Sequence, residues 1–141
     1  MGPDDTDGFW TRTTSPDGAH VWIVDAHEAK MSHWIIAGTL RRASPEAELF
    51  APPHDWSFEA RTWTSNDVLR LVGRRYPGGL PGVVVTLDVR AERGTIETQD
   101  LDELRARGAY GWLKPGVVPA PPSGPQPFDV LLRWLEAYPK E

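Results

Sequence analysis

Residues 10–40 read WTRTTSPDGAHVWIVDAHEAKMSHWIIAGTL, and the neighbouring elements can be worked out from this stretch in turn. Trp10, Trp22 and Trp34 recur at a spacing of twelve residues. Residues 15–18 (SPDG), between the first two, carry Pro and Gly at the positions typical of a tight turn. Turn signals at intervals of about 8–12 residues are typical of short antiparallel strands joined as a meander. We therefore predict a hairpin followed by a third strand.

The register of this hairpin determines which side chains share a face of the sheet. A type I turn followed by a left-handed Gly makes a three-residue loop, which places Trp10 opposite Val24. Alternate residues of a strand point to the same face, so His20 and Trp22 lie on the face of Val24. We predict the third strand over residues 33–40. Aromatic rings from neighbouring strands then lie close together on one face.

A fourth strand is predicted after a proline-rich loop. We expect this loop over residues 41–55, with one helical turn over 45–50 that the following Pro52-Pro53 pair stops. Residues 56–62 then alternate between apolar and polar, which is typical of a half-buried strand.

The alternation also predicts which side chains of this strand are buried. Trp56, Phe58 and Ala60 occupy every second position and are expected to face inward. Trp63 falls on the opposite face, where we expect its ring to be exposed or to lie at an interface. Glu59 and Arg61 are expected on that same exposed face.

Residues 64–76 are predicted to be helical. The apolar residues recur at helical spacing, namely Val68, Leu71, Val72 and Tyr76, and either Thr64 or Ser65 is suited to cap the first turn. The Pro-Gly-Gly segment that follows would end such a helix.

In the remaining chain we predict two strands, then a short helix, a connector and a final helix. Residues 83–89 and 95–98 have strand patterns, and a capping box with a terminal Gly indicates a short helix over 100–108. The elements fall into four segments: a disordered tail (1–8), an α+β core (9–113), a Pro-rich connector (114–127) and a C-terminal helix packed on the core or on a dimer partner (128–139).

This order of elements favours a single α+β domain. We expect a mostly antiparallel curled sheet, resembling a half-barrel, with two to three helices on one side. The 141 residues are enough to bury one core without disulfides or metals.

Composition excludes several classes of function. The net charge of −5 disfavours a nucleic-acid partner, because binding to phosphates needs clustered Lys and Arg. The absence of cysteine excludes disulfides and thiolate chemistry and fits a cytoplasmic protein. The N-terminus has no signal-peptide pattern, and no stretch approaches the ~20 apolar residues of a membrane helix. The excess of arginine over lysine is what we expect of a GC-rich bacterial genome.

The seven tryptophans favour a binding function. Tryptophan carries an N–H that needs a partner, and it is enriched at interfaces as well as in cores. The leading hypothesis is a binding protein, without a cofactor or metal, that presents an aromatic surface or pocket to a protein partner or an apolar ligand. The residues expected to form this site are Trp22, Trp34, Trp63, His33, Glu59 and Arg61. The alternative is that all seven tryptophans fill the core.

A second hypothesis is a small cofactor-free enzyme that performs an acid–base cyclisation or isomerisation in a Trp-lined cavity. A histidine and a carboxylate from two loops would move the protons. The candidates are His27, Glu28, His54 and Asp55. The histidine spacing matches no metal-binding motif, so surface histidines are the simpler interpretation.

Small size, acidic charge and abundant tryptophan are shared with bacterial immunity and antitoxin proteins, a similarity of composition alone. The wide apolar arc of the last helix, which includes Trp134, is compatible with a homodimer under either hypothesis.

Overall fold

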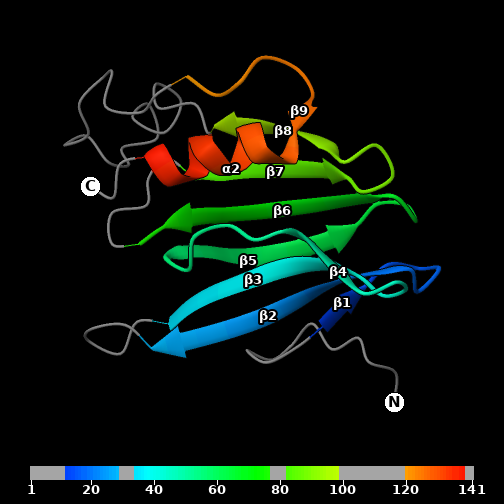
Figure 1. The fold of residues 1–141 in the computed structure, drawn as a ribbon. Coiled ribbons are helices and arrows are strands. Elements are labelled where there is room, and N and C mark those ends of the chain that lie inside the picture. Colours follow the sequence, from blue (N-terminus) through cyan, green and yellow to red (C-terminus); the bar gives the residue numbers. More distant parts are fainter. Residues whose placement is uncertain (1–11, 29–33, 77–81, 99–119, 139–141) are drawn as a thin grey trace.

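The structure, a computed structural model, describes residues 12–28, 34–76, 82–98 and 120–138 (Figure 1). Trp10, Trp112, His33, the predicted tail and the predicted helix over 100–108 lie outside the described residues. Two antiparallel sheets and one helix make up this part of the chain. Sheet A contains, in order, β1 (Arg12–Thr14), β2 (His20–Glu28), β3 (Trp34–Arg42) and β4 (Ala47–Phe50). Sheet B contains β5 (Trp56–Trp63), β6 (Val68–Arg75), β7 (Val83–Asp88), β8 (Arg93–Thr98) and β9 (Gln126–Pro127), and the helix is α2 (Phe128–Ala137).

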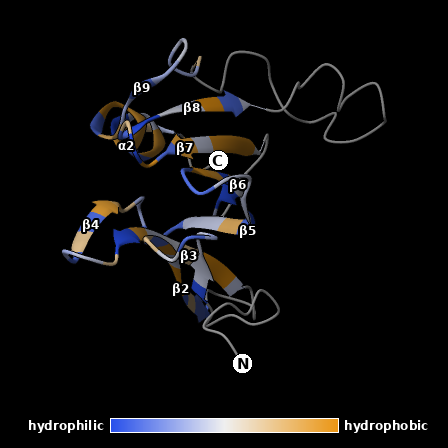
Figure 2. Ribbon diagram, turned by 90° about the vertical axis from the view of Figure 1, so that its right-hand side faces the viewer, coloured by the Kyte–Doolittle hydropathy of each residue, from blue (hydrophilic) through white to orange (hydrophobic). Residues whose placement is uncertain are grey.

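The predicted antiparallel character is confirmed, but the half-barrel with two to three helices is wrong. The described strands form two separate sheets rather than one curled sheet, and α2 is the one helix among the described residues. Figure 2 shows α2 and β4 on the same side of the strands. The helix contacts β8, β9 and β4.

The first hairpin has the predicted turn but a different register. Gly18 has a φ of 76°, and its N–H donates to the Ser15 carbonyl. The Ser15 N–H donates to the carbonyl of His20, so the loop holds four residues instead of three. Thr13 therefore lies opposite Trp22 and shares its face of the sheet. This one-residue difference determines the composition of the candidate site described below.

The predicted helix over 64–76 is instead β6, an inner strand of sheet B. Its pattern VLRLVGRR also alternates, and the structure buries Leu69, Leu71, Gly73 and Arg75 while the intervening residues face outward. Helical and strand periods are hard to separate in a short apolar run. Pairing with β5 on one side and β7 on the other decides the outcome here. The predicted helical turn over 45–50 is likewise replaced, because residues 47–50 pair with the end of β3.

A β-bulge in β5 changes which of its residues face inward. Trp56 and Phe58 are fully buried, as predicted. The bulge lies between Phe58 and Ala60, and an extra residue in one strand reverses the alternation beyond it. Ala60 is therefore exposed, whereas Arg61 and Trp63 lie opposite buried residues of β6 and are themselves half-buried. The prediction that Trp63 lies on the face opposite Trp56 is wrong for this reason, because its ring packs against the core.

The core between the sheets is built around aromatic rings that lie over glycines. The Trp22 and Phe58 rings meet edge to face, with their centroids 5.7 Å apart. The Trp22 indole lies over Gly38 of β3, and Phe58 lies over Gly73 of β6. Any Cβ at either glycine would collide with the ring above it. A hydrogen bond of 2.9 Å from the Ile36 N–H to the Ser57 hydroxyl also joins the sheets.

Candidate functional site: a donor-rich seam between the two sheets

The β1–β2 hairpin meets β5 along a line that we call the seam, formed by Thr13, His20, Trp22, Arg61 and Trp63. The Trp63 Nε1–H donates to the backbone carbonyl of Thr13 at 2.7 Å. The imidazole of His20 lies 6.5 Å from the Trp63 ring, centroid to centroid. Three of the five residues, Trp22, Arg61 and Trp63, were expected in a binding site, and the fold brings them to the same junction.

The seam contains buried polar atoms without hydrogen-bond partners. Five buried side-chain nitrogen or oxygen atoms of the described residues lack a partner, and four of them belong to the seam. They are Thr13 Oγ1, His20 Nδ1, Trp22 Nε1 and Arg61 Nε. A native protein has a few such atoms per 100 residues, and four of these five lie on the three strands that meet at the seam.

These four atoms share a hydrogen-bonding character. The indole and guanidinium N–H groups of Trp22 and Arg61 can only donate. The hydroxyl of Thr13 can also donate, as can Nδ1 of His20 in the tautomer that carries its proton there. Every unpartnered atom of the seam can therefore be satisfied by one chemical species, namely a hydrogen-bond acceptor.

Arg61 makes the seam positive. Its Nη1 donates to the carbonyl of Phe58 at 3.0 Å and lies 3.4 Å from that of Glu59, at the bulge. Within the described part of the chain no carboxylate pairs with this guanidinium. Burial lowers the pKa of Arg61, because removal from water disfavours the charged form. A half-buried charge paired with two neutral carbonyls favours the approach of an anion.

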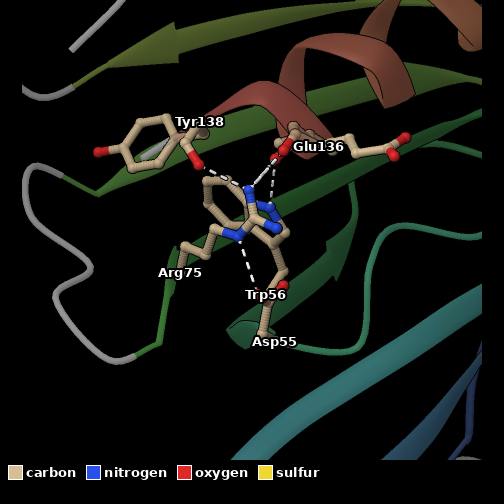
Figure 3. Close-up of polar contacts among 6 residues, drawn as sticks. Asp55, Trp56, Arg75, Glu136 and Tyr138 are labelled. Carbon is tan, nitrogen blue, oxygen red and sulfur yellow. Dashed lines mark hydrogen bonds and ion pairs between the residues drawn. The ribbon is translucent and has the colours of Figure 1, made fainter. Parts of the chain in front are cut away.

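A second inward-facing arginine, Arg75, pairs with a carboxylate and with three backbone carbonyls (Figure 3). Its Nε donates to the Asp55 carboxylate at 3.0 Å. Its Nη1 lies 2.6 to 3.0 Å from the carbonyl oxygens of Leu135, Glu136 and Tyr138, at the end of α2. A cation at a helix C-terminus satisfies carbonyls that have no partner within the helix and opposes the helix dipole. We call this group the clasp.

Two aromatic residues complete the clasp. The Trp56 Nε1–H donates to the Leu135 carbonyl at 2.9 Å, and its ring lies 5.0 Å from that of Tyr138. Arg75 is 6% exposed and Trp56 is fully buried, so the clasp closes the core beneath α2. Burial raises the pKa of Tyr138 to about 12. The clasp has a structural role, since its groups hold the helix on sheet B.

The other predicted binding residues lie apart from one another. Trp34, at the start of β3, is 40% exposed and is the large hydrophobic residue left on the surface of the described part. Glu59 is exposed at the bulge and faces Arg74, with 3.6 Å between the charged groups. Trp22, which belongs to the seam, has no exposed surface, and its ring is part of the core. His33 lies outside the described residues.

No hydrogen bond or ion pair joins the four residues of the enzyme hypothesis to one another within the described part of the chain, and their role stays a prediction. Asp55 belongs to the clasp, and the adjacent His54 is exposed in the loop before β5. His27 and Glu28 are at the far end of β2, opposite Ile35 and Trp34. The described residues contain no group of three or more His, Asp or Glu side chains that could hold a metal ion.

Thr13 and His20 were not selected as site residues from the sequence. Thr13 belongs to the seam because the hairpin loop holds four residues, which places Thr13 opposite Trp22, whereas His20 shares the face of Trp22 through the alternation of β2. The signal that could have found them is Asp17, whose carboxylate accepts from the Ser15 hydroxyl at 2.7 Å and from the Ala19 N–H at 3.1 Å. These bonds hold the longer loop, and they lower the pKa of Asp17.

No helix of the described residues is long and apolar enough to cross a membrane. No protein-family model matches the chain, and neither a curated protein nor a solved structure is significantly similar to it. The geometry of the seam is therefore the basis for any statement about function.

Proposed function

We propose that this chain is a binding protein whose seam receives an anionic group, a carboxylate above all, carried on an apolar body. The observation that carries the proposal is the presence, on the strands that meet at the seam, of four buried and unpartnered atoms that can each donate a hydrogen bond. A buried donor without a partner costs roughly 1–3 kcal/mol, and a bound acceptor removes that cost. A carboxylate offers two oxygens with about four acceptor positions, which suits a site with four donors.

The rings of the seam support the apolar part of this proposal. Trp63 and His20 are half-buried and lie next to each other, so each keeps some surface at the edge of the seam. An aromatic or aliphatic body can pack against them while its carboxylate reaches Arg61. Ionic hydrogen bonds of this kind are about twice as strong as neutral ones.

The source of the carboxylate is a small molecule in this proposal, because the donor atoms are buried and a narrow group must reach them. An acidic side chain of a protein partner is the alternative source, and a role as an immunity or antitoxin protein would require it. The cytoplasmic location inferred from the cysteine-free sequence remains part of the proposal. A homodimer through α2 stays a prediction, and within its own chain Trp134 packs against Tyr138 and donates to the Ala120 carbonyl.

The experiment is an NMR titration of the ¹⁵N-labelled full chain with benzoate, with benzamide as a neutral molecule of the same shape. We expect benzoate to shift the indole N–H resonance of Trp22 and the Nε–H resonance of Arg61. We expect benzamide to bind at least about tenfold more weakly, because it lacks the charge. Saturating benzoate at 100 times its dissociation constant should add about 2.7 kcal/mol to the free energy of unfolding.

Matched variants separate this site from general attraction of anions. Arg61→Met keeps the length of the side chain and removes its charge, and it should abolish the benzoate effect. Arg70→Met removes an equal charge from the opposite face of the neighbouring strand β6 and should leave the effect intact. Equal losses in both variants, or shifts that spare Trp22 and Arg61, would contradict the proposal.

A further inference from the structure

A separate pocket lies on the outward face of sheet B, away from the seam and the clasp. Its volume is about 290 Å³. The register of the sheet shows how it is built, because Val68, Asp88 and Arg93 form one row across β6, β7 and β8. Thr86 and Thr95 form the next row and lie directly opposite each other. The remaining lining residues are Ala91, Gly94 and Pro125.

The pocket combines apolar walls with two opposite charges. Val68, Ala91 and Pro125 provide the apolar surface. Asp88 and Arg93 are cross-strand neighbours, yet no ion pair joins them in the described structure. Oδ1 of Asp88 accepts the N–H groups of Arg90 and Ala91 in the turn, both at 3.1 Å. The guanidinium of Arg93 is exposed and makes no hydrogen bond within the described residues.

We propose that this pocket binds a free amino acid with a branched aliphatic side chain, such as leucine or valine. Arg93 would hold the carboxylate of the ligand and Asp88 its ammonium group. Because these side chains come from directly opposite residues, their separation suits a molecule that carries both charges on one carbon atom. The aliphatic side chain would pack against Val68, Ala91 and Pro125.

The size of the pocket supports a small ligand. A volume of about 290 Å³ is at the lower end of the range for ligand pockets, roughly 300–1,000 Å³. It equals the liquid volume of about ten water molecules at ~30 Å³ each. One small amino acid fits such a space, whereas a longer peptide would have to leave the pocket at one end. The hydroxyls of Thr86 and Thr95 give the floor two polar atoms that can orient the ligand.

The experiment is an NMR titration of the full chain with three probes of similar shape. L-Leucine carries both charges, isovalerate only the carboxylate, and isoamylamine only the ammonium group. We expect leucine to shift the amide resonances of Thr86, Gly94 and Thr95. We also expect its dissociation constant to be at least about tenfold lower than that of either single-charge probe. These resonances are distinct from those of the seam, so the two proposals succeed or fail separately.

Two variants with matched loss of charge test the assignment of Arg93. Arg93→Gln should weaken leucine binding about tenfold and leave isoamylamine binding unchanged. Arg70→Gln removes a charge from the same face of the sheet, one row away and outside the pocket lining, and should change leucine binding less than twofold. Ala91→Leu fills the pocket from an exposed turn and should abolish binding of leucine without unfolding the chain.

Three results would overturn the proposal. Leucine could leave the amide resonances of Thr86, Gly94 and Thr95 unmoved throughout the titration. Isovalerate could bind as tightly as leucine, which would mean that the ammonium group is not recognised. Equal weakening by Arg93→Gln and Arg70→Gln would mean that charge acts only at long range.

Discussion

Arg61 and Arg75 lie on neighbouring strands, face the same side of sheet B and differ in their partners. Arg75 contacts one carboxylate and three backbone carbonyls, and it is 6% exposed. Arg61 contacts two carbonyls, and its buried Nε has no partner. At the clasp, hydrogen bonds within the chain thus compensate for removing the guanidinium from water. At the seam they compensate only in part. The difference gives Arg75 a structural role and leaves Arg61 as the group that the proposed ligand would complete.

Substitution of Arg75 should have the largest effect on stability. Arg75→Gln leaves Asp55 and the carbonyls at the end of α2 without their cation, and removing one partner of a buried ion pair typically costs about 3–5 kcal/mol. Urea denaturation followed by tryptophan fluorescence measures the change. A loss below about 1 kcal/mol would mean that the clasp does not hold the helix.

Substitution of Gly38 should have the next largest effect, because it tests the position of Trp22 that the seam requires. A Cβ at Gly38 collides with the indole, so Gly38→Ala should cost about 1–3 kcal/mol through overpacking. The indole N–H resonance of Trp22 should also move. Gly124→Ala is the control for steric overlap, since a Cβ at Gly124 meets no atom within 4 Å. The φ of 65° at Gly124 adds only backbone strain to this variant. An unshifted indole resonance in Gly38→Ala would place Trp22 elsewhere.

Substitution of Arg61 should change the free energy of unfolding of the ligand-free protein much less than substitution of Arg75 does. Arg61→Met removes a half-buried charge that has no carboxylate partner and keeps most of the packing of its stem, so the free energy of unfolding should change by less than about 1 kcal/mol. The same urea experiment measures it. A loss of several kcal/mol would make Arg61 as structural as Arg75 and would remove the contrast between them.

The smallest effect is expected from the ionisation of Tyr138. Its pKa rises from 10.0 to about 12 in the folded protein, so the folded state holds this proton more tightly than the unfolded state. The resulting stabilisation is complete below pH 10 and is lost as the pH rises toward 12. Tyr138→Phe removes this term. The difference in Tm between the two proteins should be constant below pH 10. Above pH 10 the Tm of the wild type should fall relative to that of Tyr138→Phe.

The sequence predicts the strands more reliably than it predicts their faces. The turn at residues 15–18 and the strands beginning near Trp34, Trp56 and Val83 follow from turn residues and alternation, and the structure confirms them. The helix predicted over 64–76 fails because pairing with two neighbouring strands outweighs an ambiguous period.

The candidate site was only partly predictable, and for a specific reason. The sequence selects Trp22, Arg61 and Trp63 as candidates, but the positions of these residues in the fold depend on two single-residue shifts. One is the longer hairpin loop, which brings Thr13 opposite Trp22. The other is the bulge after Phe58, which turns Arg61 and Trp63 inward. A bulge leaves little trace in a hydrophobic pattern, because the residues after it still alternate.

The most direct test follows the Nε–H resonances of Arg61 and Arg75 in one benzoate titration of the full chain. The account predicts that the Arg61 resonance moves and saturates together with the indole N–H of Trp22. The Arg75 resonance should stay fixed, because its Nε–H is already bound to Asp55. If Arg61 stays fixed, or if both arginines move to the same extent, the seam is not the binding site.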